Sequence, residues 1–322
     1  MGFFIGCDLG GTNLRAGLVD SDTGEVAYQV SVPTLAREGH TLVMQRMVAL
    51  FRQVIAESGI EAAQVGGIGI GVPGVLDVEQ GLTLFLPNLP GTWRNVALRD
   101  TISRALNLPV SLLNDARSIT FGEWKFGAGK GAATMACLTL GTGVGGGLVI
   151  NNQLHLERGG TAAELGHQSI DFNGPRCGCG ARGCLEAYAS APALTALGVK
   201  AVIQGLTTRI GAMVDYDLNK ITPKVISQAA HEGDEIAMEI FNEVGFAIGV
   251  AVSNILVTVG PSKVVLAGGM AKAGDLLLEP VRKTVKERVS VTKIEGVEIV
   301  QAALGNNAGV IGVAMWTCEH AG

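Results

Sequence analysis

A short stretch rich in cysteine and glycine, residues 164–186, most constrains how this chain can fold. It reads ELGHQSIDFNGPRCGCGARGCLE and holds one histidine, three cysteines and a glutamate at either end. Three thiolates and one imidazole are the donor set of a closed tetrahedral zinc site, and glycines let a short loop turn around one ion. Ordinary buried thiols or a redox pair are the alternative. The stretch predicts a structural zinc ion with four ligands: His167, Cys177, Cys179 and Cys184.

The predicted metal has a structural purpose rather than a catalytic one. A bound ion would supply folding energy to a loop that is too polar and glycine-rich to be ordered by burial. It would also fix the directions of the two flanking carboxylates, Glu164 and Glu186. The carboxylates, and not the ion, are therefore the candidates for chemistry in this stretch.

Length and composition indicate a globular protein with no affinity for nucleic acid or membranes. The 322 residues suffice for two domains, 48% of them are hydrophobic, and the net charge of −5 provides no basic tract. The N-terminus lacks the leader of a signal peptide, and the apolar run Phe246 to Val259 is shorter than the roughly twenty residues that span a bilayer. Cys7, Cys137 and Cys318 lie in apolar segments, where buried thiols are expected, so we predict a reducing, cytoplasmic location.

Strands alternate with helices along the chain, which predicts an α/β protein. An apolar strand, a turn of glycine and threonine and a return strand occur once near Gly10 and again near Gly141, which suggests two related halves. The predicted strands are Phe3 to Asp8, Leu14 to Asp20, Val26 to Val32, Val65 to Val72, Val110 to Leu113, Thr134 to Leu140, Gly146 to Ile150, Lys263 to Leu266 and Val297 to Gln301. The predicted helices are Thr41 to Glu57, Val96 to Leu106, Ala116 to Phe126, Ala191 to Gln204, Lys224 to Glu232, Asp234 to Val257, Leu276 to Arg288 and Ala308 to Trp316.

Glycine-rich turns follow three of the predicted strands and are candidates for phosphate contact. Glycines let backbone N–H groups approach phosphate oxygens, a threonine adds a donor, and an aspartate can hold Mg²⁺. The three turns are Asp8 to Thr12, Gly141 to Gly143, and Gly268-Gly269. Each is also compatible with a turn without function, and none is a Walker A or Rossmann glycine motif.

The pair Asn114-Asp115 lies between a predicted strand and a predicted helix. Carboxylates at strand ends of open α/β sheets face a ligand crevice. An aspartate here is equally suited to be the N-cap of the helix. The residues alone leave both interpretations open, and Arg117 is expected to be structural rather than catalytic.

Seven motifs, in this order along the chain, carry a resemblance to a known family: DLGGT at Asp8 to Thr12, GVPG at Gly71 to Gly74, LNDA at Leu113 to Ala116, TLGTGVGGG at Thr139 to Gly147, AELGH at Ala163 to His167, CGCGARGCLE at Cys177 to Glu186, and LAGGM at Leu266 to Met270. The whole chain resembles the ROK sugar kinases, and among them the bacterial ATP-dependent glucokinases. The resemblance implies an actin-like, RNase-H-like fold of two α/β domains that close over a cleft. It implies a small domain of residues 1–116 plus about 305–322, and a large domain of 117–304 with the zinc loop.

The resemblance also implies roles for individual residues. Asp115 would be the general base that takes the proton of the attacking sugar hydroxyl. His167 would bind zinc with one ring nitrogen and face the sugar with the other. Sugar hydroxyls would be held by Gly74, Asn114, Asp115, Glu164, His167 and Glu186. The phosphates and Mg²⁺ would contact Asp8, Gly10, Gly11, Thr12, Thr142 and Gly143, and the adenosine of ATP would contact Gly268 and Gly269.

Glucose, converted to glucose 6-phosphate, is the leading substrate. ROK kinases for N-acetylmannosamine, N-acetylglucosamine, mannose, fructose or allose share the same motifs and stay open as alternatives. A sugar-responsive repressor is a further alternative, but no basic recognition helix precedes the first strand at Phe3. Polyphosphate-dependent relatives generally lack the cysteine loop, so ATP is the predicted donor. The expected partners are the sugar, ATP and further copies of the chain, as a dimer or tetramer.

Overall fold

The computed structural model describes residues 2–86 and 89–320 and contains two compact α/β units. The first unit is Met1–Ala132, Gly147–Ala163 and Ala303–Gly322, and the second is Ala133–Gly146 and Glu164–Ala302. The predicted domain division does not coincide with these units, because residues 117–132 and 147–163, assigned to the large domain, belong to the first compact unit. The α/β class predicted from the alternation of strands and helices is confirmed.

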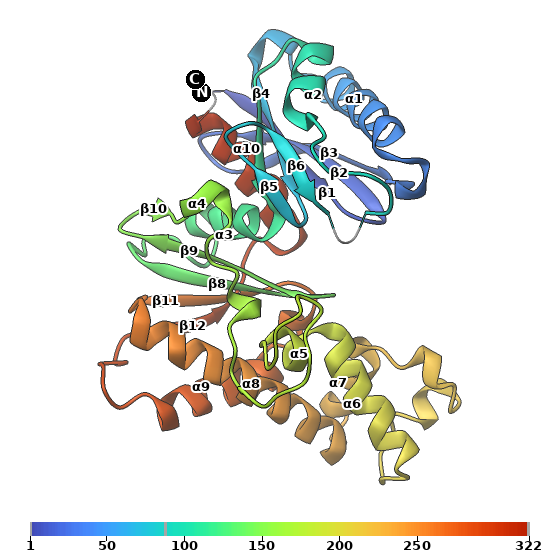
Figure 1. Ribbon diagram of the computed structural model, residues 1–322, viewed down its shortest axis with the longest axis vertical. Coiled ribbons are helices and arrows are strands. Elements are labelled where there is room, and N and C mark those ends of the chain that lie inside the picture. The colour runs from blue at the N-terminus through green and yellow to red at the C-terminus, as the bar shows by residue number, and fades with distance from the viewer. Residues whose placement is uncertain (1, 87–88, 321–322) are drawn as a thin grey trace. The chain divides into compact units, whose positions relative to one another are not determined.

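The first unit contains a five-stranded sheet (Figure 1). Its strands, in order across the sheet, are β3 (Val26–Pro33), β2 (Asn13–Asp20), β1 (Phe3–Leu9), β4 (Val65–Val72) and β7 (Val110–Asn114). β2 is antiparallel to both β3 and β1, whereas β4 is parallel to β1, and β7 is parallel to β4. The helices of this unit are α1 (His40–Glu57), α2 (Leu98–Leu106), α3 (Asp115–Phe126), α4 (Glu157–Gly160) and α10 (Ala308–His320).

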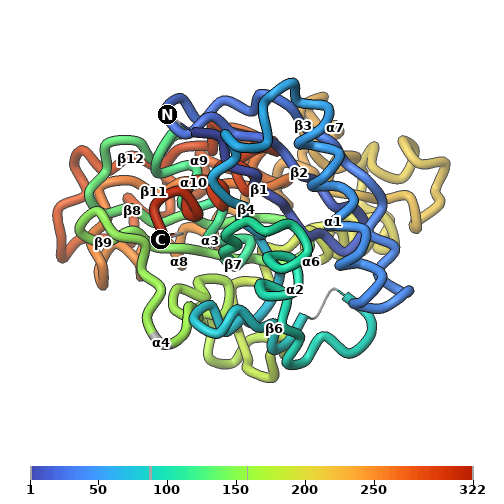
Figure 2. Tube along the Cα trace, turned by 90° about the horizontal axis from the view of Figure 1, so that it is seen from above, coloured from blue at the N-terminus to red at the C-terminus, as the bar shows by residue number. Residues whose placement is uncertain are grey.

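Glycines in two central strands allow α10 to lie directly on the first sheet. A Cβ atom at Gly6 would lie 1.9 Å from the carbonyl oxygen of Val310, and one at Gly69 would lie 2.1 Å from that of Val313. No larger residue fits such an approach. Side chains alternate across a strand, so Ile5 points to the opposite face and packs in the core that includes α1. Figures 1 and 2 show α1 and α2 side by side.

The second sheet repeats the topology of the first. Its strands, in order, are β10 (Gln153–Leu154), β9 (Val144–Ile150), β8 (Met135–Leu140), β11 (Lys263–Ala267) and β12 (Glu298–Gln301). Again an antiparallel pair, here β10 with β9, lies at one side of the sheet, and parallel strands, here β8, β11 and β12, lie at the other. This confirms the repeat predicted from the two glycine-threonine turns. The chain passes from one unit to the other within β9.

The second unit also contains the helices α5 (Glu186–Ala189), α6 (Ala191–Ile203), α7 (Pro223–His231), α8 (Glu235–Thr258) and α9 (Asp275–Arg288). By length and composition α8 could cross a membrane, but 72% of its apolar window is buried within the protein. The apolar run Phe246 to Val259 is thus mostly a core helix, as predicted. Short 3-10 helices lie at Ala36–Glu38, Ala62–Gln64, Leu165–His167, Ala212–Val214, Leu218–Lys220, Met270–Ala273 and Gly305–Asn307.

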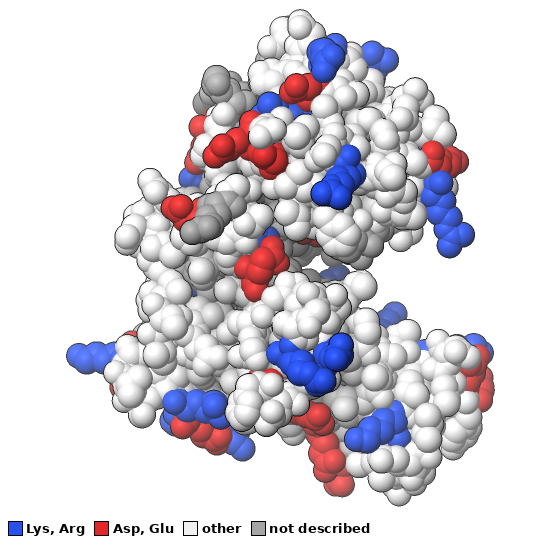
Figure 3. All heavy atoms as spheres, in the orientation of Figure 1, with Lys and Arg blue, Asp and Glu red and all other residues white. Residues whose placement is uncertain are grey.

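Two sequence-based expectations need correction. A small hairpin of β5 (Val75–Asp77) and β6 (Leu82–Phe85) was not predicted, because strands this short leave little periodicity to read. Cys7 and Cys137 are buried as expected, but Cys318 is exposed, since the buried part of α10 ends at Thr317. On the face drawn in Figure 3, acidic and basic side chains of the described residues are interspersed, in agreement with a sequence that has no basic tract.

Candidate functional site

Three parallel strands of the first unit end at one edge of the sheet. Because β1 is parallel to β4, and β4 is parallel to β7, their carboxyl ends lie together. Asp8 stands at the end of β1, Gly71 to Gly74 at the end of β4, and Asn114-Asp115 where β7 passes into α3. The sheet therefore assembles three of the motifs that the sequence singled out.

The N-cap of α3 is Asn114 and not Asp115. The Oδ1 atom of Asn114 accepts hydrogen bonds from the backbone N–H groups of Ala116 at 3.0 Å and Arg117 at 3.3 Å. Asp115 is the first residue of the helix, is half-buried, and accepts from the N–H of Ala116 at 2.9 Å. The helix dipole favours a negative charge at this position. Asn114 is thus the N-cap, and Asp115 occupies the first position of the helix.

Gly74 supports Asn114. Its carbonyl oxygen accepts a hydrogen bond from Asn114 Nδ2 at 3.1 Å. Its φ of 89° is a conformation that only glycine adopts readily. The contact of Gly74 with sugar hydroxyls stays a prediction, and what the structure adds is a role in holding the asparagine.

The carboxyl group of Asp8 lies beside the first glycine turn. The N–H of Gly10 donates to the carbonyl of Asn13 at 3.0 Å and closes the turn, while Gly11-Thr12 is exposed. Burial raises the pKa of Asp8, and the charge of Arg15 on the facing strand lowers it in part. A cation near Asp8 would offset the cost of burying its charge, which fits the Mg²⁺ role that the resemblance implies.

In the second unit, two neighbouring parallel strands end in glycine turns. Gly141 to Gly143 follows β8, and Gly268-Gly269 follows β11. Gly268 has a φ of 89°, and a Cβ atom there would lie 2.4 Å from the carbonyl oxygen of Leu140. The backbone at Gly268 therefore lies close to the end of β8, and the phosphate and adenosine contacts of these turns stay predictions.

A cavity of about 630 Å³ lies against these turns. Its volume is in the usual range of small-molecule sites, roughly 300–1,000 Å³. The glycine turns contribute Gly141, Thr142 and Gly269 to its wall. The sequence did not indicate the remaining wall, which α6, α7, α8 and the Met270–Ala273 turn provide; its members include Leu194, Thr222, Ser227, Phe241 and Met270, with the exposed Lys224 and Lys272.

Glu186 connects the second glycine turn to the cysteine loop. Its Oε2 atom accepts from the N–H of Val144 at 3.0 Å, and its Oε1 atom accepts from the thiol of Cys177 at 3.6 Å. A Cβ atom on Gly143 would lie 2.5 Å from Oε2, so any larger residue there would displace the carboxylate. Sequence reasoning missed this contact because nothing local relates residues 144 and 186.

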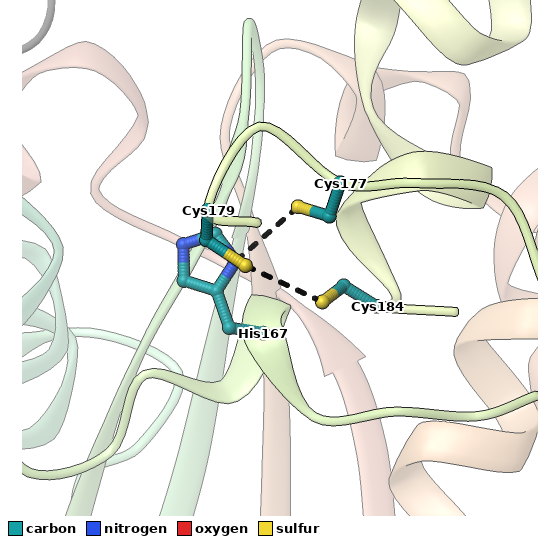
Figure 4. Close-up of side chains that lie close together, drawn as sticks. All are labelled: His167, Cys177, Cys179 and Cys184. Atoms are coloured by element: carbon teal, nitrogen blue, oxygen red, sulfur yellow. Dashed lines mark hydrogen bonds between the residues drawn. The ribbon is translucent and has the colours of Figure 1, made fainter. Parts of the chain in front are cut away.

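His167 and the three clustered cysteines converge on one point (Figure 4). Their ligand atoms all lie within 4.8 Å of one another. Cys177 Sγ is 3.7 Å from His167 Nδ1, and Cys179 Sγ is 3.7 Å from Cys184 Sγ. Tetrahedral zinc with Zn–S bonds of about 2.3 Å separates its ligands by about 3.7 Å, whereas disulfide sulfurs are about 2.05 Å apart. Donor set and spacing fit a zinc ion.

The thiols of this group differ in environment. Cys177 and Cys184 are buried, and Cys179 is exposed. Burial, followed by the neighbouring thiols, raises the pKa of Cys184 to about 12. A metal ion deprotonates the thiols that it binds. Binding of zinc would therefore convert these buried thiols to thiolates.

The other two predicted sugar contacts of this unit, Glu164 and His167, lie at the two ends of the 3-10 helix Leu165–His167. Glu164 is exposed, and its carbonyl accepts from the N–H of His167 at 3.0 Å. The Nδ1 atom of His167 faces Cys177, so the Nε2 atom is on the other side of the ring. The division of labour between the two ring nitrogens, predicted from the resemblance, is compatible with this orientation.

Comparison with known proteins defines the class. The chain belongs to the ROK family, whose model matches residues 4–320. The glucokinase of Thermotoga maritima is 37% identical over 321 residues, which cover 99% of this chain and 98% of that enzyme. The structure of a ROK family glucokinase from Streptomyces griseus in complex with glucose and AMPPNP has a TM-score of 0.85 and 33% identity, and the match covers 99% of this chain and all of that one.

One further relative is a regulator. The xylose repressor of Caldicellulosiruptor bescii is 32% identical over 312 residues, which cover 97% of this chain and 77% of the repressor. The comparisons confirm the predicted family and the actin-like two-domain architecture of sugar kinases.

Proposed function

We propose that this protein is a sugar kinase that transfers the γ-phosphoryl group of ATP to glucose and forms glucose 6-phosphate. The cavity beside the second glycine turn carries the proposal, since its size and apolar wall suit a nucleoside. An inorganic polyphosphate has no group to fill such a space. Glucose as the acceptor is supported by the full-length similarity to glucokinases, one of them complexed with glucose and AMPPNP.

In this proposal Asp115 is the general base, taking the proton of the attacking sugar hydroxyl. The rigid start of α3 supports that role, because it holds the carboxylate in a fixed direction. Phosphoryl transfer depends on positioning and charge neutralisation more than on covalent help. Several acceptor carboxylates also suit a polyhydroxylated, uncharged ligand. Sugar hydroxyls are held by Asn114, Glu164, His167 and Glu186.

The donor side uses backbone more than side chains. Gly10, Gly11 and Thr12 in one turn, and Thr142 and Gly143 in the other, contact the phosphates. Mg²⁺ neutralises phosphate charge, and Asp8 is the carboxylate proposed to hold it through water. Gly268-Gly269 gives the nucleoside close access to backbone, because no side chain stands there.

We further propose that His167, Cys177, Cys179 and Cys184 bind one structural zinc ion. The ion cross-links the loop and so stabilises its fold, because the loop has few apolar side chains to bury. Its consequence for the sugar is positional, because His167 is itself a ligand and Glu186 closely follows the ligand Cys184 in the chain.

The test is a comparison of kcat/KM with Mg-ATP for glucose, mannose, fructose, allose, N-acetylglucosamine and N-acetylmannosamine, with polyphosphate as the alternative donor. We expect glucose to lead by tenfold or more, about 1.4 kcal/mol in transition-state free energy. A different leading sugar would leave the kinase assignment standing and overturn glucose. No turnover on any sugar by folded protein would contradict the kinase proposal itself.

We also propose that the enzyme acts in the cytoplasm as a dimer or tetramer. None of the six cysteines forms a disulfide, which suits a reducing compartment. Light scattering of the purified protein decides the oligomeric state, and a monomer at micromolar concentration would contradict that part of the proposal.

A further inference from the structure

A buried arginine, Arg117, holds the side chain of Asn114. Only 2% of Arg117 is exposed. Its Nη1 atom donates to Asn114 Oδ1 at 2.9 Å, and its Nη2 atom donates to the carbonyl oxygen of Ala162. The planar guanidinium group thus joins the N-cap of α3 to the segment that follows α4, within the first unit.

The hydrogen bonds of Asn114 allow its amide only one orientation. Three N–H groups point at Oδ1, two from the backbone of Ala116 and Arg117 and one from the Arg117 guanidinium. A flipped amide would place its own N–H groups against these donors. Oδ1 therefore has no lone pair to spare for a ligand. Of the two N–H groups on Nδ2, one donates to Gly74 and the other can donate to a ligand.

We infer that Asn114 acts on the sugar only as a hydrogen-bond donor, and that Arg117 is the positioning residue that enforces this. The inference rests on the proposed function. Asn114 then offers a donor where Asp115, the next residue, offers an acceptor. Neighbouring sugar hydroxyls match such a pair, since one oxygen accepts from the amide while another O–H donates to the base.

The sharpest test replaces Asn114 by aspartate. Asn114→Asp keeps an oxygen for the N-cap and for Arg117, so the helix start should fold as before. It loses both N–H groups of Nδ2, the one toward the sugar and the one that donates to Gly74. We expect kcat/KM for glucose to fall about 10- to 100-fold, as far as in Asn114→Ala. Activity of Asn114→Asp within twofold of wild type would overturn the inference, because it would show that an acceptor suffices.

Monodeoxyglucoses separate a lost donor from a general disturbance. The wild-type enzyme should lose activity on the analogue that lacks the partner hydroxyl. Asn114→Ala and Arg117→Met should show no additional loss on that same analogue, since the contact is already gone. If folded Arg117→Met discriminates the analogues as the wild type does, Arg117 is merely structural and the inference fails.

A matched control comes from the second unit. Arg282 donates through Nε at 3.1 Å and Nη2 at 2.8 Å to the carbonyl of Ile299, so Arg282→Met removes bonds of the same kind without touching Asn114. We expect its discrimination among the sugars to be unchanged. If Arg117→Met does not fold, Asn114→Asp decides the matter. Wild-type protein that is inactive on glucose contradicts the proposed function, whereas active wild type with unaffected variants contradicts only this inference.

Discussion

The two sheets share one topology but carry different chemistry at their strand ends. In the first unit, a carboxylate lies at the end of each of two strands: Asp8 near the end of β1, and Asp115 directly after β7. In the second unit, β8 and β11 end in glycine turns beside a cavity, and β12, the counterpart of β7, ends at Gln301. The shared topology therefore places candidate ligand-binding residues at the strand ends of both sheets. The residue types at those ends differ, with carboxylates suited to the phosphoryl acceptor in the first unit and glycine turns suited to the phosphoryl donor in the second.

The second half also contains a long insertion. Residues 34–64 separate β3 from β4, whereas residues 155–262 separate their counterparts β10 and β11. The insertion includes the cysteine loop, much of which is exposed and glycine-rich. The start of α3, in contrast, is ordered by buried hydrogen bonds of Asn114 and Arg117. The start of α3 is thus ordered by the chain's own hydrogen bonds, whereas the cysteine loop has the ligand set of a loop ordered by a metal ion.

The largest predicted effect removes the carboxylate that distinguishes the first half. Asp115→Ala should lower kcat by about 10²–10⁴-fold, the usual worth of a general base. Glucose binding, measured by calorimetry, should be partly kept, because the base acts in the transition state. Gln301→Ala, at the corresponding strand end of the second half, is the control and should stay within twofold of wild type. Near-normal turnover by folded Asp115→Ala would refute the base assignment.

Removal of the metal tests whether the inserted loop depends on an ion. We expect one zinc per chain in the wild type and far less in Cys184→Ser, with a melting temperature lowered by roughly 10 °C and faster proteolysis within residues 167–186. Cys318→Ser, which removes an exposed thiol outside the group, should change none of these. Protein with little zinc and intact activity would contradict the proposal.

Much of the fold could be predicted from the sequence because its signals are local. Most major helices and strands lie within about two residues of the predicted positions, as for α1 and β4, since apolar periodicity and glycine stops act over a few residues. The exception is α10, which was predicted to end at Trp316 and continues to His320. The same reason explains why the zinc group was visible, as its cysteines are crowded together. The boundary at Asn114-Asp115 was not decidable, because both residues cap helices well.

Contacts between distant residues could not be predicted. The contact of Glu186 with Val144 and that of Arg117 with Ala162 join segments with no shared pattern. The cavity is likewise walled by three helices whose apolar residues look like ordinary core residues in the sequence. Tertiary packing alone gives these residues their roles.

A smaller effect on activity is expected from a substitution in the Gly141 to Gly143 turn, which contacts Glu186. Gly143→Ala would place a Cβ atom 2.5 Å from Glu186 Oε2, so the carboxylate must move. Because we assign Glu186 to the sugar, KM for glucose should rise about tenfold, with zinc content unchanged. Gly309→Ala is the matched control, since its Cβ would meet only Ile119, at 3.6 Å. An unchanged KM would show that the Glu186 carboxylate does not contribute to sugar binding.

The smallest effect concerns the counterpart helices α1 and α8, which precede β4 and β11. The N-cap of α1 is Gly39, without a side-chain hydrogen bond, whereas Asp234 caps α8 and accepts from the N–H of Ala237 at 2.8 Å. Burial raises the pKa of Asp234, but hydrogen bonds from the N–H groups of Arg209 and Ala237 outweigh it, so the net pKa is lowered. The folded pKa thus lies below the unfolded value of about 3.9.

The stability that Asp234 contributes should therefore be complete above that unfolded value and disappear as the pH falls through the folded one. At pH 7, Asp234→Ala should lower the free energy of unfolding, measured in urea, by about 1 kcal/mol, and its difference from wild type should shrink in acid. Asp234→Asn keeps a capping oxygen without a titrating charge, so it should retain most of the stability and lose this pH dependence. Equal stability of Asp234→Ala and wild type at pH 7 would show that α8, like α1, needs no side-chain cap.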